Sequence, residues 1–245
     1  MRNFVKALSL SAAFLTATVL PSKAVVVAIH QSEKTTETRQ VSNFNEINSF
    51  GSFNVLVKLD GTESLKLEGS SEDLAKIETV VENGVLKIRP KKQNNDQWNW
   101  KLSEKVNVYI SAKKLSALTL NGSGNIKVDG KLTGENFAIK LNGSGNINTN
   151  LSVAKANMAL NGSGNIVAAG KVDDLSVAIA GSGLVDATEL KATESNLKIA
   201  GSGNIKVDAD KKLTASLLGS GSVKYVGNPE VNVSKMGSGT VSKMK

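Results

Sequence analysis

The chain has 245 residues, of which 40% are hydrophobic and 4% aromatic, and its 30 basic and 22 acidic residues give a net charge of +8. It contains no cysteine and one histidine, His30. A Cys-His pair is therefore impossible, and a Ser-His-Asp triad or a histidine-based zinc site would depend on this single imidazole close to the N-terminus. The scarcity of aromatic residues and the preference for lysine over arginine argue against nucleic-acid binding.

Residues 1–24 are typical of a secretory signal peptide. A short basic stretch precedes an apolar run over residues 7–20, and small residues precede a cut after Ala24. A cut after Ala28 fits the sequence as well. The apolar run is shorter than the roughly 20 residues that a membrane-spanning helix needs. We therefore expect export to the periplasm, the cell surface or the medium, with no transmembrane span once the signal is removed.

A flexible N-terminus is expected over residues 25–39, and residues 40–115 are predicted to form a β-rich first segment with a hairpin and an exposed loop. Hydrophobic residues alternate with polar ones on both sides of Asp60-Gly61, which marks a turn. A short helix is expected after Ser70 or Ser71, either of which can cap it. Asn83-Gly84 lies between two β-like runs and predicts a hairpin.

Residues 116–245 carry a Gly-Ser-Gly box seven times. Short stretches with period-2 alternation flank each box, and no stretch has a helical period. A repeat of 18–21 residues without helices predicts one turn of a β-solenoid per repeat. We expect this solenoid and the β-rich segment over residues 40–115 to form one continuous all-β domain. The glycines of the boxes are Gly122, Gly124, Gly143, Gly145, Gly162, Gly164, Gly181, Gly183, Gly201, Gly203, Gly219, Gly221, Gly237 and Gly239.

The boxes are interpreted as structural corners of the solenoid. A phosphate-binding loop would lead into a helix, whereas each box leads into a strand. A calcium-binding repeat would need an aspartate in a nine-residue period, and the boxes carry asparagine in a period twice as long. Stacked corners would place asparagines above one another in a ladder of amide hydrogen bonds, formed by Asn125, Asn146, Asn165 and Asn204.

The polar segment Lys91–Lys101 holds the two tryptophans of the chain, Trp98 and Trp100. In an extended segment, side chains two residues apart point the same way, so these rings and Lys101 are a candidate contact surface for a sugar or a partner protein. The alternative is that both rings pack against the solenoid.

No residues are predicted to be catalytic, to bind a cofactor or to bind a metal. The adjacent pairs Glu72-Asp73 and Asp173-Asp174 have poor geometry for a hydrolase that uses two carboxylates, because neighbouring residues on a strand face opposite sides. No cofactor is expected.

The chain resembles a known family on several motifs taken together. Phe44-x-x-Ile47-x-x-x-Gly51-x-x-x-Val55, "NGVLKI", "VNVYISAKKLSALTLNGSGNI" and the repeated boxes are similar to the head GIN domain family of putative auto-transporter adhesins, exported bacterial proteins of unknown function. The resemblance covers roughly residues 40–240. It implies a right-handed parallel β-helix and an extracytoplasmic location, and it implies no catalytic residues. Because the last repeat ends close to Lys245, we expect no translocator barrel after it.

The sequence therefore predicts an exported, non-catalytic binding or structural module of the bacterial cell envelope, adhesin-like, with a glycan or an envelope protein as its partner. Two alternatives are a scaffold that assembles with copies of itself and a β-helix enzyme that acts on polysaccharides. Light scattering would test for self-assembly, and an assay for new reducing ends or unsaturated sugars would test for the enzyme.

Overall fold

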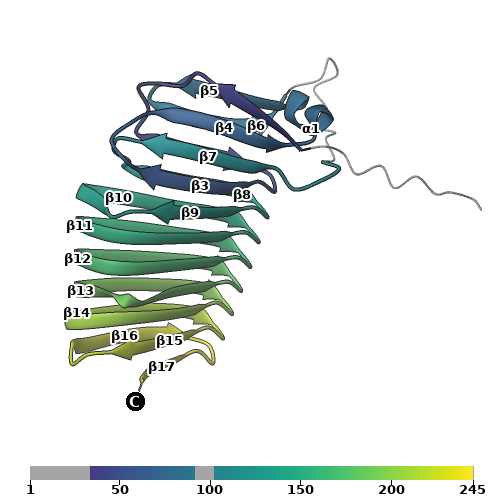
Figure 1. The fold of residues 1–245 in the computed structure, drawn as a ribbon. Helices are drawn as coiled ribbons and strands as arrows, with labels where there is room; N and C mark the ends of the chain where they lie inside the picture. The colour runs from purple at the N-terminus through teal and green to yellow at the C-terminus, as the bar shows by residue number, and fades with distance from the viewer. Residues whose placement is uncertain (1–33, 92–101, 245) are drawn as a thin grey trace, which may run out of the picture. The chain divides into compact units, whose positions relative to one another are not determined.

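The computed structural model describes residues 34–91 and 102–244 (Figure 1). The predicted signal peptide and His30 lie outside these residues. One helix, α1 (Ser71–Ala75), and a single sheet of 17 strands make up the described part of the chain, which belongs to one compact unit. The strands are β1 (Thr35–Arg39), β2 (Glu46–Phe50), β3 (Asn54–Leu59), β4 (Ser64–Gly69), β5 (Ile77–Glu82), β6 (Val85–Pro90), β7 (Asn107–Ala112), β8 (Ala117–Gly122), β9 (Asn125–Asp129), β10 (Leu132–Gly143), β11 (Asn146–Gly162), β12 (Asn165–Gly181), β13 (Leu184–Gly201), β14 (Asn204–Gly219), β15 (Ser222–Val226), β16 (Glu230–Met236) and β17 (Thr240–Lys243).

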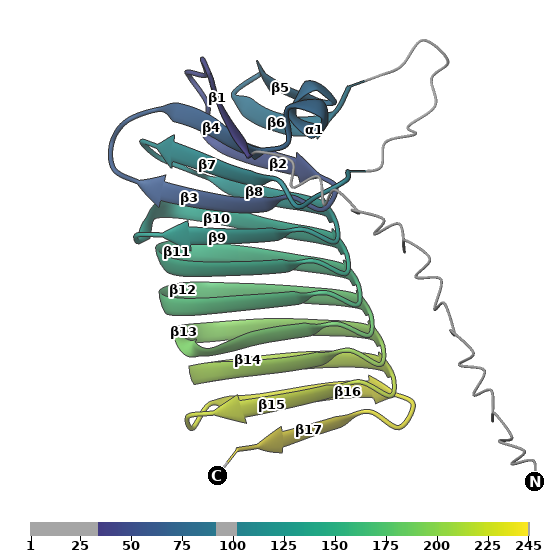
Figure 2. The same cartoon turned by 45° about the vertical axis from the view of Figure 1, so that its right-hand side comes forward.

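The predicted parallel β-helix is confirmed. From β8 to β17 each coil lies on the next in a parallel ladder, and every box pairs with the box of the preceding coil (Figures 1 and 2). The strand segments before the boxes stack into one face of the coil, which we call the pre-box face. The segments after the boxes stack into the post-box face. Each long strand from β11 to β14 contributes its first half to the post-box face and its second half to the pre-box face.

Inward-pointing side chains repeat at equivalent positions of successive coils and form the core. One ladder on the pre-box face and one on the post-box face are each exposed by 2% or less at every rung. Because a single coil cannot cover its own apolar side, stacking the coils creates the core. The ladders are Leu120, Leu141, Leu160, Ile179, Ile199 and Leu217, and Ile126, Ile147, Ile166, Val185, Ile205 and Val223.

Differences in repeat length are absorbed at the bend opposite the boxes. The ladder between β12 and β13 shifts register between Val167 and Ala169, and the ladder between β13 and β14 shifts after Ala187. The boxes themselves remain in register, as in the pairing of Gly181 with Gly201. The box corners therefore fix the stacking, while the opposite bends tolerate insertions.

The N-terminal coils do not stack in chain order. The β2–β3 coil lies on the β8–β9 coil, and β6 and β7 lie on the outer side of β2 and β3. The turn between β2 and β3 is itself a corner of the box series, because Gly51 has a φ of 121° and its carbonyl accepts the backbone N–H groups of Ser123 and Gly124. This corner is not among the seven Gly-Ser-Gly boxes of the sequence, because Phe53 replaces the second glycine.

Local signals in the first segment are confirmed in two places. Ser70 caps α1 by accepting the backbone N–H of Asp73, and the Asn83-Gly84 turn joins the antiparallel strands β5 and β6. Asp60-Gly61 is a turn as predicted, but β3 and β4 are not paired with each other, because β7 lies between them.

Strand β1 lies within the segment for which the sequence predicts flexibility. It pairs with β4 in antiparallel fashion. Its last residue, Arg39, donates to the carbonyl oxygens of Ile77 (2.8 Å) and Leu74 (2.9 Å) and pairs with Glu37 (3.0 Å). These long-range contacts hold the strand and could not be read from the local sequence.

Candidate binding site

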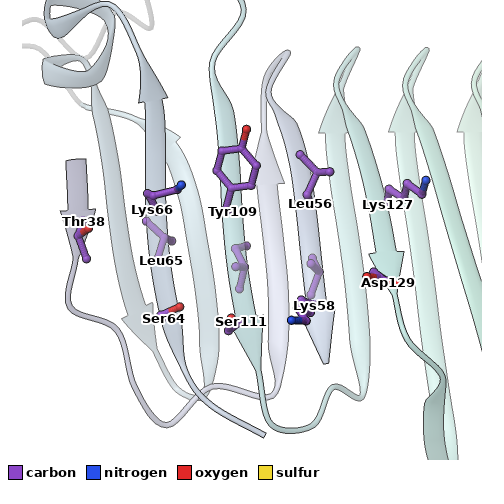
Figure 3. Close-up of a pocket in the computed structure, with 12 residues that line it drawn as sticks. Thr38, Leu56, Lys58, Ser64, Leu65, Lys66, Tyr109, Ser111, Lys127 and Asp129 are labelled. Atoms are coloured by element: carbon purple, nitrogen blue, oxygen red, sulfur yellow. The ribbon is translucent and has the colours of Figure 1, made fainter. Parts of the chain in front are cut away.

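The post-box face of the N-terminal coils contains a groove of about 650 Å³. Its central row of outward-pointing residues crosses five strands, since Thr38, Lys66, Tyr109, Leu56 and Lys127 are successive cross-strand neighbours. We call this site the tyrosine groove. In Figure 3 the Tyr109 ring stands on β7 between Lys66 on β4 and Leu56 on β3.

Tyr109 is held by contacts on two sides. The Lys66 ammonium lies 4.6 Å from the centre of the ring, within the range of a cation–π interaction. The Tyr109 hydroxyl donates to Glu68 (3.3 Å), which also accepts from the Asn107 amide (3.2 Å). Burial raises the pKa of Tyr109, and the charge and hydrogen bond of Glu68 raise it further. The phenol is therefore a neutral donor with a fixed ring plane.

A second row of polar residues runs beside the ring. Ser111 lies between Ser64 and Lys58 in the ladder, and Lys58 lies opposite Asp129. The Ser111 hydroxyl donates to Asp60 (3.0 Å). Hydrogen bonds from Thr62, together with that of Ser111 and the charge of Lys58, hold the pKa of Asp60 below its usual range.

The groove combines an aromatic face, an aliphatic side chain and several ammonium groups. Lys58, Lys66 and Lys127 are exposed and line it, whereas Asp129 is the only carboxylate among its lining residues. An aromatic ring can stack on the apolar face of a sugar, and lysines can bind acidic groups. Within residues 34–91 and 102–244, no three acidic or histidine side chains are grouped so that they could hold a metal ion.

The backbone N–H groups of each Gly-Ser-Gly box donate to carbonyl groups of the box in the preceding coil. Ser144 and Gly145 both donate their N–H groups to the carbonyl of Gly122 (3.1 Å each), and Asn146 donates to Gly124 (3.0 Å). The same pattern recurs from coil to coil. A loop whose N–H groups are already satisfied by the preceding coil has none left to hold a phosphate.

Asparagine ladders run on both sides of the boxes. Asn146 donates to Asn125 (2.8 Å) and Asn165 donates to Asn146 (2.9 Å), as the sequence predicts. The prediction is wrong for Asn204, because Leu184 occupies the rung between it and Asn165. A second ladder, which the sequence analysis missed, links Asn48, Asn121, Asn142 and Asn161.

The predicted contact residues Trp98, Trp100 and Lys101 lie outside the described residues. The chain that follows them is anchored by Asp73, whose side chain is buried and accepts the backbone N–H groups of Ser103 (3.0 and 3.1 Å) and Glu104 (3.1 Å).

One member of each acidic pair forms an ion pair with a lysine. Asp174 is exposed and lies 4.0 Å from Lys155 in the ladder, and Glu72 pairs with Lys76 (2.9 Å) at the surface of α1. Both contacts are solvent-exposed ion pairs of the kind that adds little to stability. In the part of the chain that the structure covers, no helix is long and apolar enough to cross a membrane.

The fold and the box corners define a β-solenoid with a groove on its post-box face. The chain belongs to the family described as putative auto-transporter adhesin, head GIN domain, whose model matches residues 43–229. The resemblance found in the sequence is thereby confirmed. A search of curated proteins gave no match.

The chain is similar to several solved structures of proteins from Bacteroides and Parabacteroides species. A putative adhesin from Bacteroides fragilis is 25% identical with a TM-score of 0.79, and the match covers 86% of this chain and 97% of that one. A putative lipid binding protein from Parabacteroides distasonis is 27% identical with a TM-score of 0.74, over 88% and 98% of the two chains. A putative adhesin from Parabacteroides merdae, 21% identical with a TM-score of 0.74, shares the fold over 88% and 98%.

Sequence reasoning missed the tyrosine groove. Its residues come from five strands, and in the sequence each one is an ordinary outward-facing position of a strand. A usable signal was the single tyrosine in "VNVYISA", because Tyr109 is a large aromatic residue on the polar side of an alternating strand.

Proposed function

We propose that the protein is an exported, non-catalytic binding module of the bacterial cell envelope, adhesin-like, and that the tyrosine groove binds an acidic polysaccharide. The observation that carries the proposal is the Tyr109 ring, fixed between Lys66 and Leu56 with further lysines beside it. The signal-like residues 1–24 and the membership of an adhesin family support export and a binding role.

The polarity of the groove favours an acidic ligand over a neutral one. Three lysines and one aspartate line it. Two further carboxylates, Glu68 and Asp60, lie next to it and accept from Tyr109 and Ser111, so the ammonium groups are the charges that the groove itself offers to a ligand. The three lysines remain exposed, which suits contact with carboxylate or sulfate groups along a polymer. Attraction of this kind is weakened by salt, because the Debye length is about 8 Å at physiological ionic strength.

A glycan array tests the proposal. The chain from residue 25 should bind acidic polysaccharides in preference to neutral ones, and Tyr109→Ala should remove most of the signal. Lys140→Gln and Lys198→Gln, on the pre-box face, are matched controls and should leave binding unchanged. An array with no acidic hit, or equal signals from wild type and Tyr109→Ala, would refute the proposal.

The self-assembling scaffold has less support. Within residues 34–91 and 102–244 no strand pairs with the outer edge of β16, and Lys235 lies at an inward position of that strand, in register with the buried Leu217. An inward-pointing lysine on an edge strand opposes the addition of another strand.

A further inference from the structure

The central row of outward residues in the tyrosine groove continues beyond the groove along the post-box face. Lys127 on β9, which lies at the β9 side of the groove in Figure 3, is the cross-strand neighbour of Asn148 on β11. Asn148 is the neighbour of Val167 on β12, and Val167 is the neighbour of Asp186 on β13. One unbroken line of side chains therefore leads from the groove to β13.

The groove is longer across the strands than along them. Its lining residues come from β1, β4, β7, β3 and β9, which is four strand spacings or about 19 Å. Along a strand, its outward-facing lining residues are two positions apart at most, as Tyr109 and Ser111 are, which is about 7 Å. A polymer in the groove therefore lies across the strands, and one of its ends points toward Asn148.

Asn148 and Val167 are both open to a ligand. Asn148 is exposed, and among the residues that the structure describes its side chain has no hydrogen-bond partner, so its amide can donate to and accept from hydroxyl groups. Val167 is 41% exposed, and in the described chain it is the one large exposed hydrophobic side chain on the post-box face. Covering it with the C–H groups of a sugar ring would remove apolar surface from water.

The line becomes unfavourable for an acidic polymer at Asp186. The Asp186 carboxylate accepts from the Thr188 hydroxyl (2.7 Å) and from the Lys206 ammonium (3.2 Å). A negative charge therefore stands in the path of an acidic ligand, and the nearest positive charge beyond it is already paired. The favourable part of the line ends at Val167.

We propose that an acidic polysaccharide bound in the tyrosine groove lies along the stack and extends over Asn148 and Val167, with Asp186 at the end of the site. This inference rests on the proposed function and adds the direction of the polymer and the length of its site. From β1 to β12 the site spans six strand spacings, about 29 Å. At one sugar unit per strand spacing, the groove alone holds about four units and the whole site about six.

Calorimetric titration with heparin fragments of defined length tests the proposal. Heparin carries both carboxylate and sulfate groups, and fragments of four and of eight sugar units are titrated into the chain from residue 25. We expect wild type to bind the longer fragment about tenfold more tightly. Asn148→Ala and Val167→Ser should each lose about threefold in affinity for the longer fragment and nothing for the shorter one. Thermal unfolding checks that each variant is folded.

Matched variants separate the extension from general attraction of a basic protein. Asn157→Ala changes an exposed asparagine of the same strand, β11, on the pre-box face. Leu218→Ser removes an exposed apolar side chain of β14 on that face. Both control variants should bind the two fragments as wild type does.

Asp186→Asn gives a test with the opposite sign. Removing the carboxylate leaves Lys206 free for an acidic group, so affinity for the longer fragment should rise about threefold while affinity for the shorter one stays the same. Asp174→Asn removes the same charge beside Lys155 on the pre-box face and should raise neither affinity.

The outcomes distinguish the extension from the groove. If Tyr109→Ala weakens binding of the shorter fragment but Asn148→Ala and Val167→Ser leave the longer one unaffected, the extension is refuted and the groove stands. Equal losses for the two fragments, or equal effects in the control variants, would refute the extension as well. If neither fragment binds, or Tyr109→Ala binds as wild type does, the groove fails as a site for heparin and the extension fails with it.

Discussion

A Cβ atom built on Gly143 would lie 2.4 Å from the carbonyl oxygen of Gly122 in the preceding coil. Real Cβ atoms do not come this close to backbone oxygen, and Gly143 also has a φ of 132°. The corner therefore requires glycine for two separate reasons, close approach and backbone conformation.

Gly143→Ala should lower the free energy of unfolding by about 2–4 kcal/mol, since the added methyl group must push two coils apart in a strained conformation. Ser144→Ala, at the exposed residue next to it, should change stability by less than about 0.5 kcal/mol. Denaturant titration of both variants is the measurement. Equal stabilities for the two would show that the corner does not depend on close stacking.

Asp73→Asn should lower stability at neutral pH by about 1–3 kcal/mol, because an amide cannot accept all the N–H groups that the carboxylate accepts from Ser103 and Glu104. Burial alone would raise the pKa of Asp73, but the hydrogen bonds from Ser103, Glu104 and Ser70 and the contact with Lys76 outweigh it, so its pKa lies below the usual range.

The sign of the pH dependence follows from that lowered pKa. The stabilisation by Asp73 is fully present above the unfolded-state pKa of about 3.9 and is lost as the pH falls through the folded-state value. The difference between wild type and Asp73→Asn should thus be large at pH 7 and shrink in acid. A difference that stays constant from pH 7 to the acid transition would contradict this assignment.

Asn142→Ala should cost about 1 kcal/mol, because Asn142 donates to Asn121 and accepts from Asn161 at a half-buried position. Asn148→Ala is the matched change, since Asn148 is exposed on the same strand system and its side chain forms no hydrogen bond among the described residues. Thermal melts that fall equally for the two variants would mean that the ladder adds no stability.

The groove lysines should contribute through charge. Lys58→Gln and Lys127→Gln should each weaken binding of an acidic polysaccharide by about fivefold at low salt and by less at high salt. Titrations at several salt concentrations measure this effect. Losses that are the same at every ionic strength would indicate a role in packing instead of charge.

The sequence predicted the elements whose signals are local. The box period predicted the coils, Asn83-Gly84 predicted the β5–β6 hairpin, and Ser70 predicted the helix cap. Pairing between distant segments was not predicted, because no local pattern shows that β6 and β7 lie outside β2 and β3. The tyrosine groove depends on this pairing, since it brings Tyr109 next to Leu56.

The asparagine ladders show the same limit on a smaller scale. The repeated "GNI" motif correctly places Asn125, Asn146 and Asn165 above one another. Asn204 has the same motif but the coil before it carries Leu184, so the ladder stops. A repeat predicts what one coil looks like, while a hydrogen bond between coils depends on both neighbours.

The most direct test of the central claim is calorimetric titration of wild type, Tyr109→Phe and Tyr109→Ala with the strongest acidic polysaccharide from the array. If the ring plane binds the sugar, Tyr109→Phe should retain affinity within about threefold, and Tyr109→Ala should lose about tenfold or more. Equal affinities for wild type and Tyr109→Ala, with both proteins folded, would contradict the account.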